Sequence, residues 1–351
     1  MNRLAFVVPG ALERPTGGSR YDRQMVEGLR AQGADIEVHC LQGNFPEPDA
    51  KAADALRRCF AHLTAQHWVI VDGLVLGANP SLFASQANRL NYIALVHHPL
   101  ADETGLSPAK RAAFQRSEAA ALALAQGVIV TSDFTRRRLA QLALYQHPVH
   151  VVTPGVEDVA LRAPRTPSSV HFLCLGSLIP RKGQDQLIAS LDLLKEHAWR
   201  ASLVGSTDLN PAFTCECQAQ IDRAGLSNRI TLTGALSDRA LEEMWASADV
   251  LVLPSRYEGY GMVGTERSAR GSPLRTTDAG ALADRRAGGA GRGVAQDDPA
   301  ALTQALTTMI QSPQRLEELT RQARATRAAL KGWPEQAIHF AHAIQAIRGD
   351  D

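Results

Sequence analysis

The sequence predicts two α/β domains in series, each built on a parallel sheet with helices on both faces. Three observations lead to this prediction. Short apolar segments alternate with helix-like segments, the alternation restarts after a stretch rich in Pro and Ser, and the chain of 351 residues is long enough for two domains. Apolar strands separated by helices of about ten or more residues are typical of parallel sheets that are buried on both faces.

In the first domain, apolar runs such as LAFVVPG and YIALVHHP predict the strands. We expect strands over residues 4–10, 35–41, 68–73, 92–99, 127–132 and 149–155. Alanine, leucine and charged residues predict helices over 21–32 and 108–126. The segment 163–169, which reads APRTPSS, is typical of a linker because Pro and Ser favour turns.

In the second domain, the same rhythm of strands and helices returns. We expect strands over residues 170–176, 200–206, 229–234 and 249–255, and helices over 183–196, 212–224 and 238–247. Residues 299–349 look helical, with an interruption around 332–334. The predicted division is therefore 1–163, 164–331 and a C-terminal helix within 332–351.

Composition narrows the class of function. The chain is 45% hydrophobic and 21% charged, as in ordinary globular proteins, and its formal net charge of +1 gives no indication of nucleic-acid binding. The five cysteines include one C-x-C but no second pair for zinc, so we interpret them as reduced thiols. Because there is no apolar run of about 18 residues, we expect a cytoplasmic protein and leave peripheral membrane contact open.

The segment DVLVLPSRYEGYGMVGTE, residues 249–266, carries the most specific chemistry. Glu258 and Glu266, with seven residues between them, bracket the exit of a predicted buried strand and the start of a helix. Helix N-termini and glycine-rich loops bind pyrophosphate, and ionised carboxylates accept hydrogen bonds from vicinal diols. The two glutamates could therefore hold a hexose and a ribose on either side of a pyrophosphate. The alternative is a pair of solvated charges beside a helix start.

These residues resemble the E-x7-E motif of the retaining glycosyltransferases of family 4. That family has the GT-B fold, in which two Rossmann-like domains face a cleft. The resemblance implies an acceptor-side first domain, a nucleotide-sugar donor domain, and a final helix that packs back towards the first domain. It places donor-binding residues in the loop and the helix that follows it: Glu258, Gly259, Tyr260, Gly261, Met262 and Glu266.

Other motifs extend the resemblance. Residues 176–183, GSLIPRKG, resemble a family element in which an arginine and a lysine hold the donor diphosphate. Lys182 occupies the lysine position, whereas Ser177 stands where the family usually has arginine, so we consider Arg181 as a second donor contact. A hydroxyl cannot replace the bidentate charged contact of a guanidinium.

In the first domain, Gly17 and Gly18 resemble the family's glycine loop, which approaches the donor phosphate. His98, in HHPLADETGL, matches the family histidine that contacts the transferring sugar, with His97 as the alternative. A lone histidine at a strand end is otherwise more often a capping or core residue.

The implied reaction is metal-independent transfer of a glycosyl group with retention, by departure and attack on one face, in which Lys182 stabilises the leaving diphosphate and Glu258 orients the sugar. The family uses no cofactor; the donor is a UDP-, GDP- or ADP-sugar, and the acceptor is a glycan, a lipid or a small molecule. Alternatives are a GT-B protein that binds nucleotide sugars without transfer, a nucleotide-sugar epimerase, and a phosphorylase.

One segment departs from the family pattern. Polar residues stand there where apolar or neutral ones are common: Arg267, Ser268, Ser272, Arg275, Arg285, Arg286 and Arg292. Because an unpaired buried arginine is costly, we expect weakened packing behind the donor site.

Overall fold

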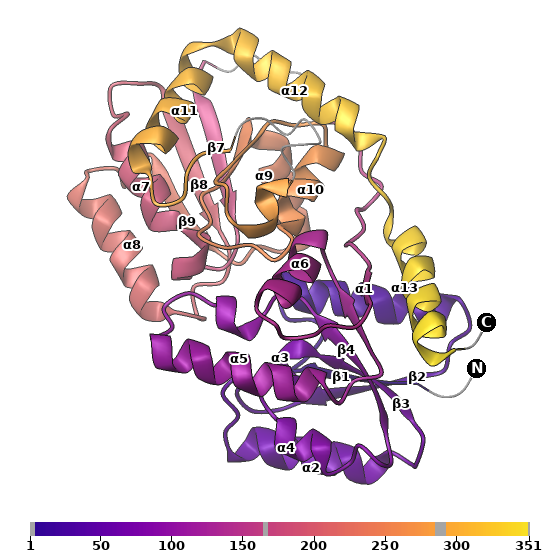
Figure 1. The fold of residues 1–351 in the computed structure, drawn as a ribbon. Coiled ribbons are helices and arrows are strands. Elements are labelled where there is room, and N and C mark those ends of the chain that lie inside the picture. Colours follow the sequence, from indigo (N-terminus) through magenta and orange to yellow (C-terminus); the bar gives the residue numbers. More distant parts are fainter. Residues whose placement is uncertain (1–3, 164–167, 285–292, 350–351) are drawn as a thin grey trace. The chain divides into compact units, whose positions relative to one another are not determined.

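The computed structural model describes residues 4–163, 168–284 and 293–349 (Figure 1). It contains two compact units, one formed by residues 1–155 together with 331–351 and the other by 156–330. Among the described residues, each unit has one parallel sheet, which confirms the predicted fold class. Residues 164–167 of the expected linker, and the arginines at 285, 286 and 292, lie outside the described residues.

The first unit is built on a six-stranded sheet in the order β2-β1-β3-β4-β5-β6, and every neighbouring pair is parallel. Its strands are β1 (Leu4–Pro9), β2 (Ile36–Leu41), β3 (Trp68–Asp72), β4 (Asn91–Val96), β5 (Gly127–Val130) and β6 (Val149–Val151). Parallel strands place all their carboxyl ends at one edge of the sheet, where open α/β sheets bind ligands.

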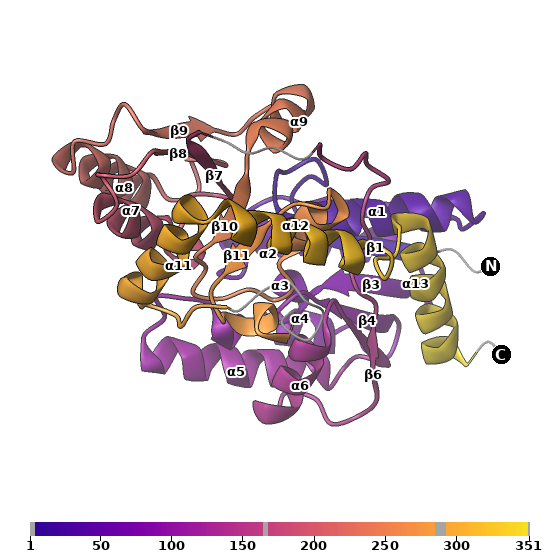
Figure 2. The ribbon, with the colours of Figure 1, turned by 90° about the horizontal axis from the view of Figure 1, so that it is seen from above.

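Helices cover both faces of this sheet. They are α1 (Gly17–Ala31), α2 (Ala50–His62), α3 (Gly73–Leu76), α4 (Pro80–Ala84), the 3-10 turn η1 (Leu100–Asp102), α5 (Pro108–Leu122), α6 (Asp133–Gln141) and α13 (Trp333–Arg348). Helices α2 to α6 contribute to one apolar core. On the other face α1 and α13 lie side by side, in both Figure 1 and Figure 2. A Cβ on Gly28 would stand 2.3 Å from Cβ of Ala337, so only glycine permits this approach.

The second unit is built on a five-stranded parallel sheet in the order β11-β10-β7-β8-β9. Its strands are β7 (Val170–Leu175), β8 (Trp199–Val204), β9 (Ile230–Gly234), β10 (Val250–Leu253) and β11 (Leu274–Thr276). Its helices are η2 (Pro180–Lys182), α7 (Gln184–Asp192), α8 (Pro211–Arg223), α9 (Asp238–Ser247), α10 (Met262–Ala269), η3 (Gly280–Leu282), α11 (Pro299–Gln311) and α12 (Pro313–Arg327). Helices α7, α8, α11 and α12 pack on one face, while α9, α10 and η3 pack on the other.

Some elements differ from the prediction. Strand β11 was not expected, because it has only three residues and contains Arg275 and Thr276, yet it pairs in parallel with β10. Helices α2, α3 and α4 were also missed, and α3 and α4 are too short for a helical period to stand out. Short elements depend more on tertiary packing than on local propensity.

All five cysteines are free thiols, as the sequence predicts. Within the described part of the chain, no helix has both the length and the apolar character needed to cross a membrane.

The buried carboxyl group of Glu118 should make the stability of the first unit depend on pH. Its side chain is buried on α5, and Oε2 accepts a hydrogen bond of 2.9 Å from the Leu100 amide. Burial raises the pKa of Glu118 to about 8, against the lowering effect of the Leu100 hydrogen bond. Because the folded state binds this proton more tightly than the unfolded state, the contribution to stability is complete below the unfolded pKa of about 4.3 and is lost as pH rises through 8.

We therefore expect the free energy of unfolding of the wild type to fall by roughly 2–4 kcal/mol between pH 5 and 8.5, and this fall to be absent in Glu118→Gln. Urea denaturation at a series of pH values measures this loss, with the exposed Glu317→Gln as the matched control. Equal pH slopes for the wild type and Glu118→Gln would show that Glu118 ionises normally.

Candidate active site

The candidate site of the second unit lies in the two loops that follow β7 and β10. These strands are neighbours in the sheet and run parallel. The loop after β7 contains Ser177 and ends with η2 and Gly183, while the loop after β10 runs from Pro254 to Gly261. Since both loops leave the carboxyl edge of the sheet, their side chains are brought together there.

The centre of this site is an ion pair between Lys182 and Glu258. The Nζ of Lys182 stands 2.6 Å from Oε1 of Glu258, and Oγ of Ser255 donates to the same oxygen at 2.8 Å. Glu258 is only 5% exposed, so the pair is largely shielded from water. The two sequence-predicted residues with the most specific motifs therefore lie in direct contact.

The charge of Glu258 is stabilised by its neighbours. Burial alone raises the pKa of Glu258, but the positive charges of Lys182 and Arg181, with the hydrogen bonds from Lys182 and Ser255, outweigh burial and hold the pKa below its usual value. Glu258 is consequently an ionised hydrogen-bond acceptor across the neutral range.

Three contacts lock the two loops together. Gly183 has φ +68°, and a Cβ at this position would stand 2.0 Å from the carbonyl oxygen of Pro254, so the close approach requires glycine. The Arg256 amide donates to the Arg181 carbonyl at 2.8 Å. The Arg256 guanidinium also makes a two-pronged contact with Asp185, at 2.9 and 2.8 Å. The position of Lys182 relative to Glu258 is therefore fixed by backbone as well as side chains.

Helix α10 begins directly after the glycine loop. Gly261 is the N-cap in the left-handed region at φ +79° and offers no side chain to cap the helix, so the first amides of α10 are directed towards the loop. The Ala281 amide of η3 donates to the Glu258 carbonyl at 2.9 Å, which supports the loop from below. Glu266 is 8% exposed and is the fifth residue of α10. Its position one turn into the helix agrees with the expected place of a second carboxylate.

The remaining predicted donor residues occupy the same loops. The Arg181 guanidinium donates to the Tyr257 carbonyl at 3.3 Å, so it braces the loop that carries Glu258. The Ser177 carbonyl accepts a hydrogen bond from Gln184 at 3.0 Å. Gly259 is buried, Tyr260 is half-buried, and the half-buried Met262 opens α10.

In the first unit, one of the two predicted glycines lies beside a histidine. Gly17 and Gly18 are the first residues of α1, and a Cβ on Gly18 would lie 3.5 Å from the His97 ring. His97 stands 3.0 Å from a carboxylate oxygen of Asp22. His98, the histidine preferred from sequence, instead faces Glu103, with 3.5 Å between Nε2 and the carboxylate.

The expectation of weak packing around Arg267 is wrong. Arg267 is fully buried, but its guanidinium donates to the carbonyls of Trp245, Ala248 and Asp249, at 3.2, 2.8 and 2.9 Å. Burial lowers its pKa to about 9, so the side chain is still charged at neutral pH. A hydrogen-bonded arginine of α10 is thus packed against the carbonyls at the end of α9. Arg270 pairs with Glu242.

Sequence reasoning missed several residues that position the site. Ser255 and Asp185 were not singled out, although Ser255 lies within the recognised motif. Asp72 and Asp22 were also missed as partners of His97. Asp72 offered one detectable signal, because it is the last residue of a buried strand, where ligand-binding side chains often lie.

Comparisons with known proteins show which sequences and folds this chain is similar to. The sequence profile of a family described as Glycosyl transferases group 1 matches residues 169–312. An MMP α-(1→4)-mannosyltransferase of Mycolicibacterium hassiacum is 26% identical over 84% of this chain and 74% of its own length. A lipopolysaccharide core biosynthesis mannosyltransferase, LpcC of Rhizobium leguminosarum, is 32% identical over 49% of this chain. The chain spans 48% of the length of LpcC.

Solved structures show the same fold. Sucrose-phosphate synthase from Thermosynechococcus elongatus superposes with a TM-score of 0.82 at 20% identity, over the whole of both chains. Anabaena HepE, solved with UDP and glucose, superposes with a TM-score of 0.77 at 18% identity over 98% of this chain and 99% of its own. These likenesses identify the architecture as GT-B.

Proposed function

We propose that the chain, whose residues 169–312 match the group 1 glycosyl transferases, moves a glycosyl group from a nucleotide-sugar donor to an acceptor, with retention at the anomeric carbon and without a metal ion. The single observation that carries this proposal is the buried contact of Lys182 with Glu258, at the carboxyl edge of β7 and β10 and beside the uncapped start of α10.

The donor is held by charge and by diol recognition. Lys182 and the first amides of α10 supply positive charge for the diphosphate. Glu258 accepts hydrogen bonds from hydroxyls of the transferring sugar, and Glu266 accepts them from the ribose diol. Support for these roles comes from the burial of both glutamates and from the ionised state of Glu258.

The reaction proceeds on one face of the sugar. The bond between the anomeric carbon and the diphosphate oxygen breaks, Lys182 stabilises the charge on the leaving diphosphate, and the acceptor oxygen bonds to the anomeric carbon from the same side. The acceptor proton passes to the leaving phosphate oxygen. Glu258 is a poor candidate for a covalent nucleophile, because Lys182 and Ser255 both donate to Oε1 and stabilise its negative charge.

Ser177 motivates the second candidate function, a protein that binds nucleotide sugars without transferring them. A hydroxyl supplies no positive charge to the diphosphate, and Arg181 is directed to the Tyr257 carbonyl. If Lys182 cannot stabilise the leaving group alone, donor binding remains while transfer is lost.

One experiment separates these functions. The full chain is incubated with UDP-, GDP- and ADP-sugars, with and without hexose and hexose 6-phosphate acceptors, and the products are identified by NMR. The proposal predicts a glycoside that forms only with acceptor and keeps the donor's anomeric configuration. An inverted product would refute the one-face mechanism, an altered sugar without acceptor would indicate an epimerase, and tight donor binding without any product would favour the second candidate.

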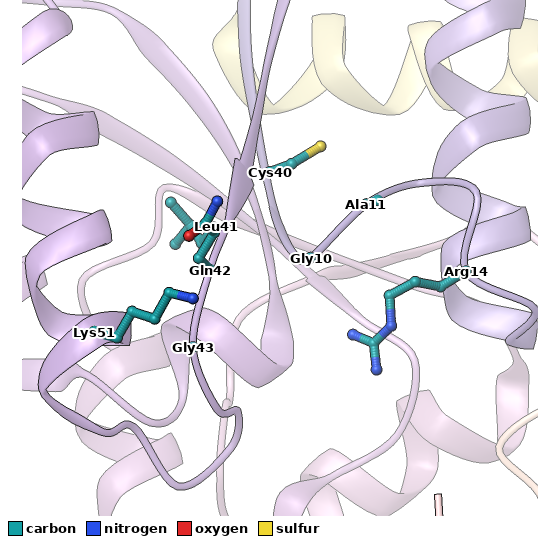
Figure 3. Close-up of a pocket in the computed structure, with 8 residues that line it drawn as sticks. All are labelled: Gly10, Ala11, Arg14, Cys40, Leu41, Gln42, Gly43 and Lys51. Carbon is teal, nitrogen blue, oxygen red and sulfur yellow. The ribbon is translucent and has the colours of Figure 1, made fainter. Parts of the chain in front are cut away.

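The acceptor site is proposed from a hollow in the first unit. The hollow has a volume of about 450 Å³ and opens where β1 and β2 end (Figure 3). It is lined by Gly10, Ala11, Arg14, Cys40, Leu41, Gln42, Gly43 and Lys51. The Arg14 guanidinium and the Lys51 ammonium stand on opposite sides of it. Two cations around one opening favour an acceptor that carries a phosphate or carboxylate group.

We expect the double variant Arg14→Gln and Lys51→Gln to lose selectivity for a phosphorylated acceptor. The wild type should bind a hexose 6-phosphate roughly tenfold more tightly than the unphosphorylated hexose, since a charged contact contributes about 1.5 kcal/mol. Calorimetry measures both affinities, and the exposed Arg57→Gln serves as the control. A preference that survives in the double variant would place the anionic group elsewhere.

A further inference from the structure

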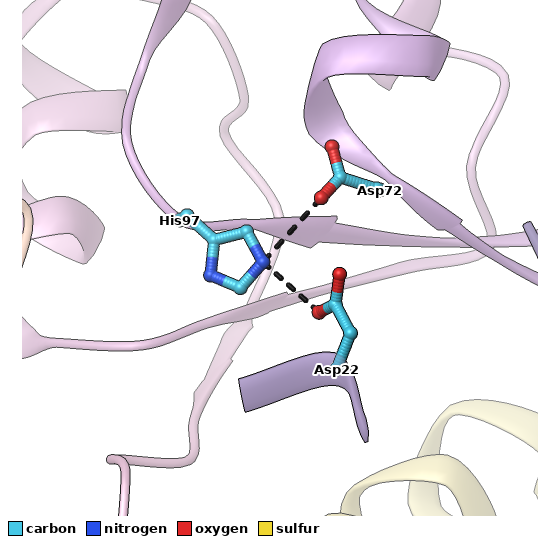
Figure 4. Close-up of side chains that lie close together, drawn as sticks. All are labelled: Asp22, Asp72 and His97. Carbon is cyan, nitrogen blue, oxygen red and sulfur yellow. Dashed lines mark hydrogen bonds and ion pairs between the residues drawn. The ribbon is translucent and has the colours of Figure 1, made fainter. Parts of the chain in front are cut away.

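Three buried or half-buried titratable groups form a cluster at the carboxyl edge of the first unit's sheet. Asp22 belongs to α1, Asp72 is the last residue of β3, and His97 follows β4 (Figure 4). Nε2 of His97 stands 3.0 Å from an oxygen of Asp22 and 3.4 Å from an oxygen of Asp72. Each aspartate is 2% exposed. The cluster therefore joins three elements that are distant in sequence.

Hydrogen-bond chemistry fixes the first proton of the imidazole. Two carboxylates flank Nε2, and an ionised carboxylate can only accept, so Nε2 must carry a hydrogen. The other oxygen of Asp72 already accepts the Leu74 amide at 2.7 Å, which holds this carboxylate in place. The tautomer is thus determined by the two aspartates.

The second ring nitrogen has a different environment. Figure 4 shows Nδ1 on the side of the ring that faces away from both aspartates. Within the described residues, no protein group forms a hydrogen bond with Nδ1. The His97 side chain is 18% exposed, so this side of the ring is accessible to a ligand. Two adjacent negative charges favour a second proton on this nitrogen.

We propose that Asp22 and Asp72 hold His97 as a doubly protonated imidazolium, whose Nδ1–H is a fixed hydrogen-bond donor to a hydroxyl oxygen of a substrate. This inference rests on the proposed function, and in it Asp22 and Asp72 are positioning residues. With both carboxylates ionised the cluster carries a net charge of −1, so it selects a neutral hydroxyl rather than an anion. Because Nδ1 is already protonated, His97 cannot remove the acceptor proton, which leaves that proton to the departing phosphate.

The electrostatic surroundings agree with this geometry. Burial lowers the pKa of His97, but the charges and hydrogen bonds of Asp22 and Asp72 outweigh burial and raise it to about 10. Burial also raises the pKa of Asp22 to about 6, against the lowering effect of His97, so this carboxylate is ionised at neutral pH. Of the described residues, the charged groups that face the ring are Asp22 on α1 and Asp72 on β3; Tyr21 on α1 contacts its edge, with 5.4 Å between ring centroids.

Nuclear magnetic resonance tests the charge state directly in the full chain. The protein is labelled with ¹⁵N-histidine, and the His97 signals are assigned by their absence in His97→Gln. We expect both ring nitrogens of wild-type His97 to stay protonated from pH 5.5 to 8.5. A wild-type titration with a midpoint near the ordinary value of about 6.5 would overturn the proposal. This titration needs neither donor nor acceptor, so it is independent of whether the chain transfers sugar.

Variants of Asp22 and Asp72 test whether these aspartates keep His97 protonated. In Asp72→Asn, and separately in Asp22→Asn, the midpoint for His97 should fall towards neutral pH, whereas Asp54→Asn, which removes an exposed partner of Arg57, should leave it unchanged. An unchanged His97 titration in both folded variants would also overturn the proposal. If neither variant folds, the wild-type titration decides alone.

The pH profile of transfer gives a second readout. We expect kcat/KM of the wild type to show no ionisation of His97 between pH 6.5 and 8.5. In Asp72→Asn, kcat/KM should fall as pH rises through the lowered titration midpoint of His97. A purely structural role of Asp72 would lower kcat by the same factor at every pH.

Discussion

Replacing Lys182 with methionine should lower kcat/KM for sugar transfer by roughly 10²–10³-fold while leaving the fold intact. Lys182 is the cation that contacts Glu258, and in the proposed reaction its charge stabilises the leaving diphosphate. Methionine keeps most of the side-chain volume, so the packing of this residue, the last of η2, is retained. Initial rates at several donor concentrations, together with circular dichroism of the same samples, measure both quantities.

Two companions sharpen the Lys182 experiment. Lys195→Met removes another lysine of the second unit, one that pairs with Asp192 and is 46% exposed, and it should leave the rate unchanged. Glu258→Ala should also abolish transfer, and the double variant should lose little more than either single variant, because residues in direct contact are not additive. A loss below about fivefold for Lys182→Met would remove this lysine from the mechanism.

Replacing Arg267 with alanine should lower the free energy of unfolding by about 3–5 kcal/mol. The change leaves three buried carbonyl oxygens without their donor and opens a cavity behind α10. Thermal and urea denaturation measure the loss. Because α10 carries Glu266, weaker donor binding is expected to accompany it.

The matched control is Arg239→Ala on α9. Arg239 is 92% exposed and pairs with Glu243 of the same helix, so we expect a change within about 0.5 kcal/mol. If Arg267→Ala lowers the free energy of unfolding by no more than Arg239→Ala does, the buried guanidinium does not stabilise the second unit.

The parts of the site that could be predicted from sequence are those with local signals. Lys182 and Glu258 each follow a buried strand, and parallel strands bring such loops to one edge. A motif can therefore be placed before any contact is known. The predicted strands correspond to the observed ones for the same reason, since each apolar run is long enough to indicate a buried strand.

The parts that could not be predicted depend on contacts between distant segments. Asp22 and Asp72 lie far from His97 in sequence, so neither could be linked to it, and His98 was preferred instead. Three of the four carbonyl acceptors of Arg267 belong to residues 245–249, about twenty positions earlier, and only the folded chain brings them to the guanidinium. A polar residue in an apolar segment therefore does not by itself indicate a weak core, because distant segments can supply its hydrogen-bond partners.

The most direct test of the donor site is calorimetric titration of the full chain with UDP, GDP and ADP, repeated with Glu266→Ala. Glu317→Ala, an exposed glutamate of α12, is the control. The account predicts that one nucleotide binds with a stoichiometry of one, and that its affinity falls at least about tenfold in Glu266→Ala but not in the control, because the ribose loses its carboxylate partner. Absence of binding by folded wild-type protein, or equal affinity in Glu266→Ala, would contradict a nucleotide-sugar site between β10 and α10.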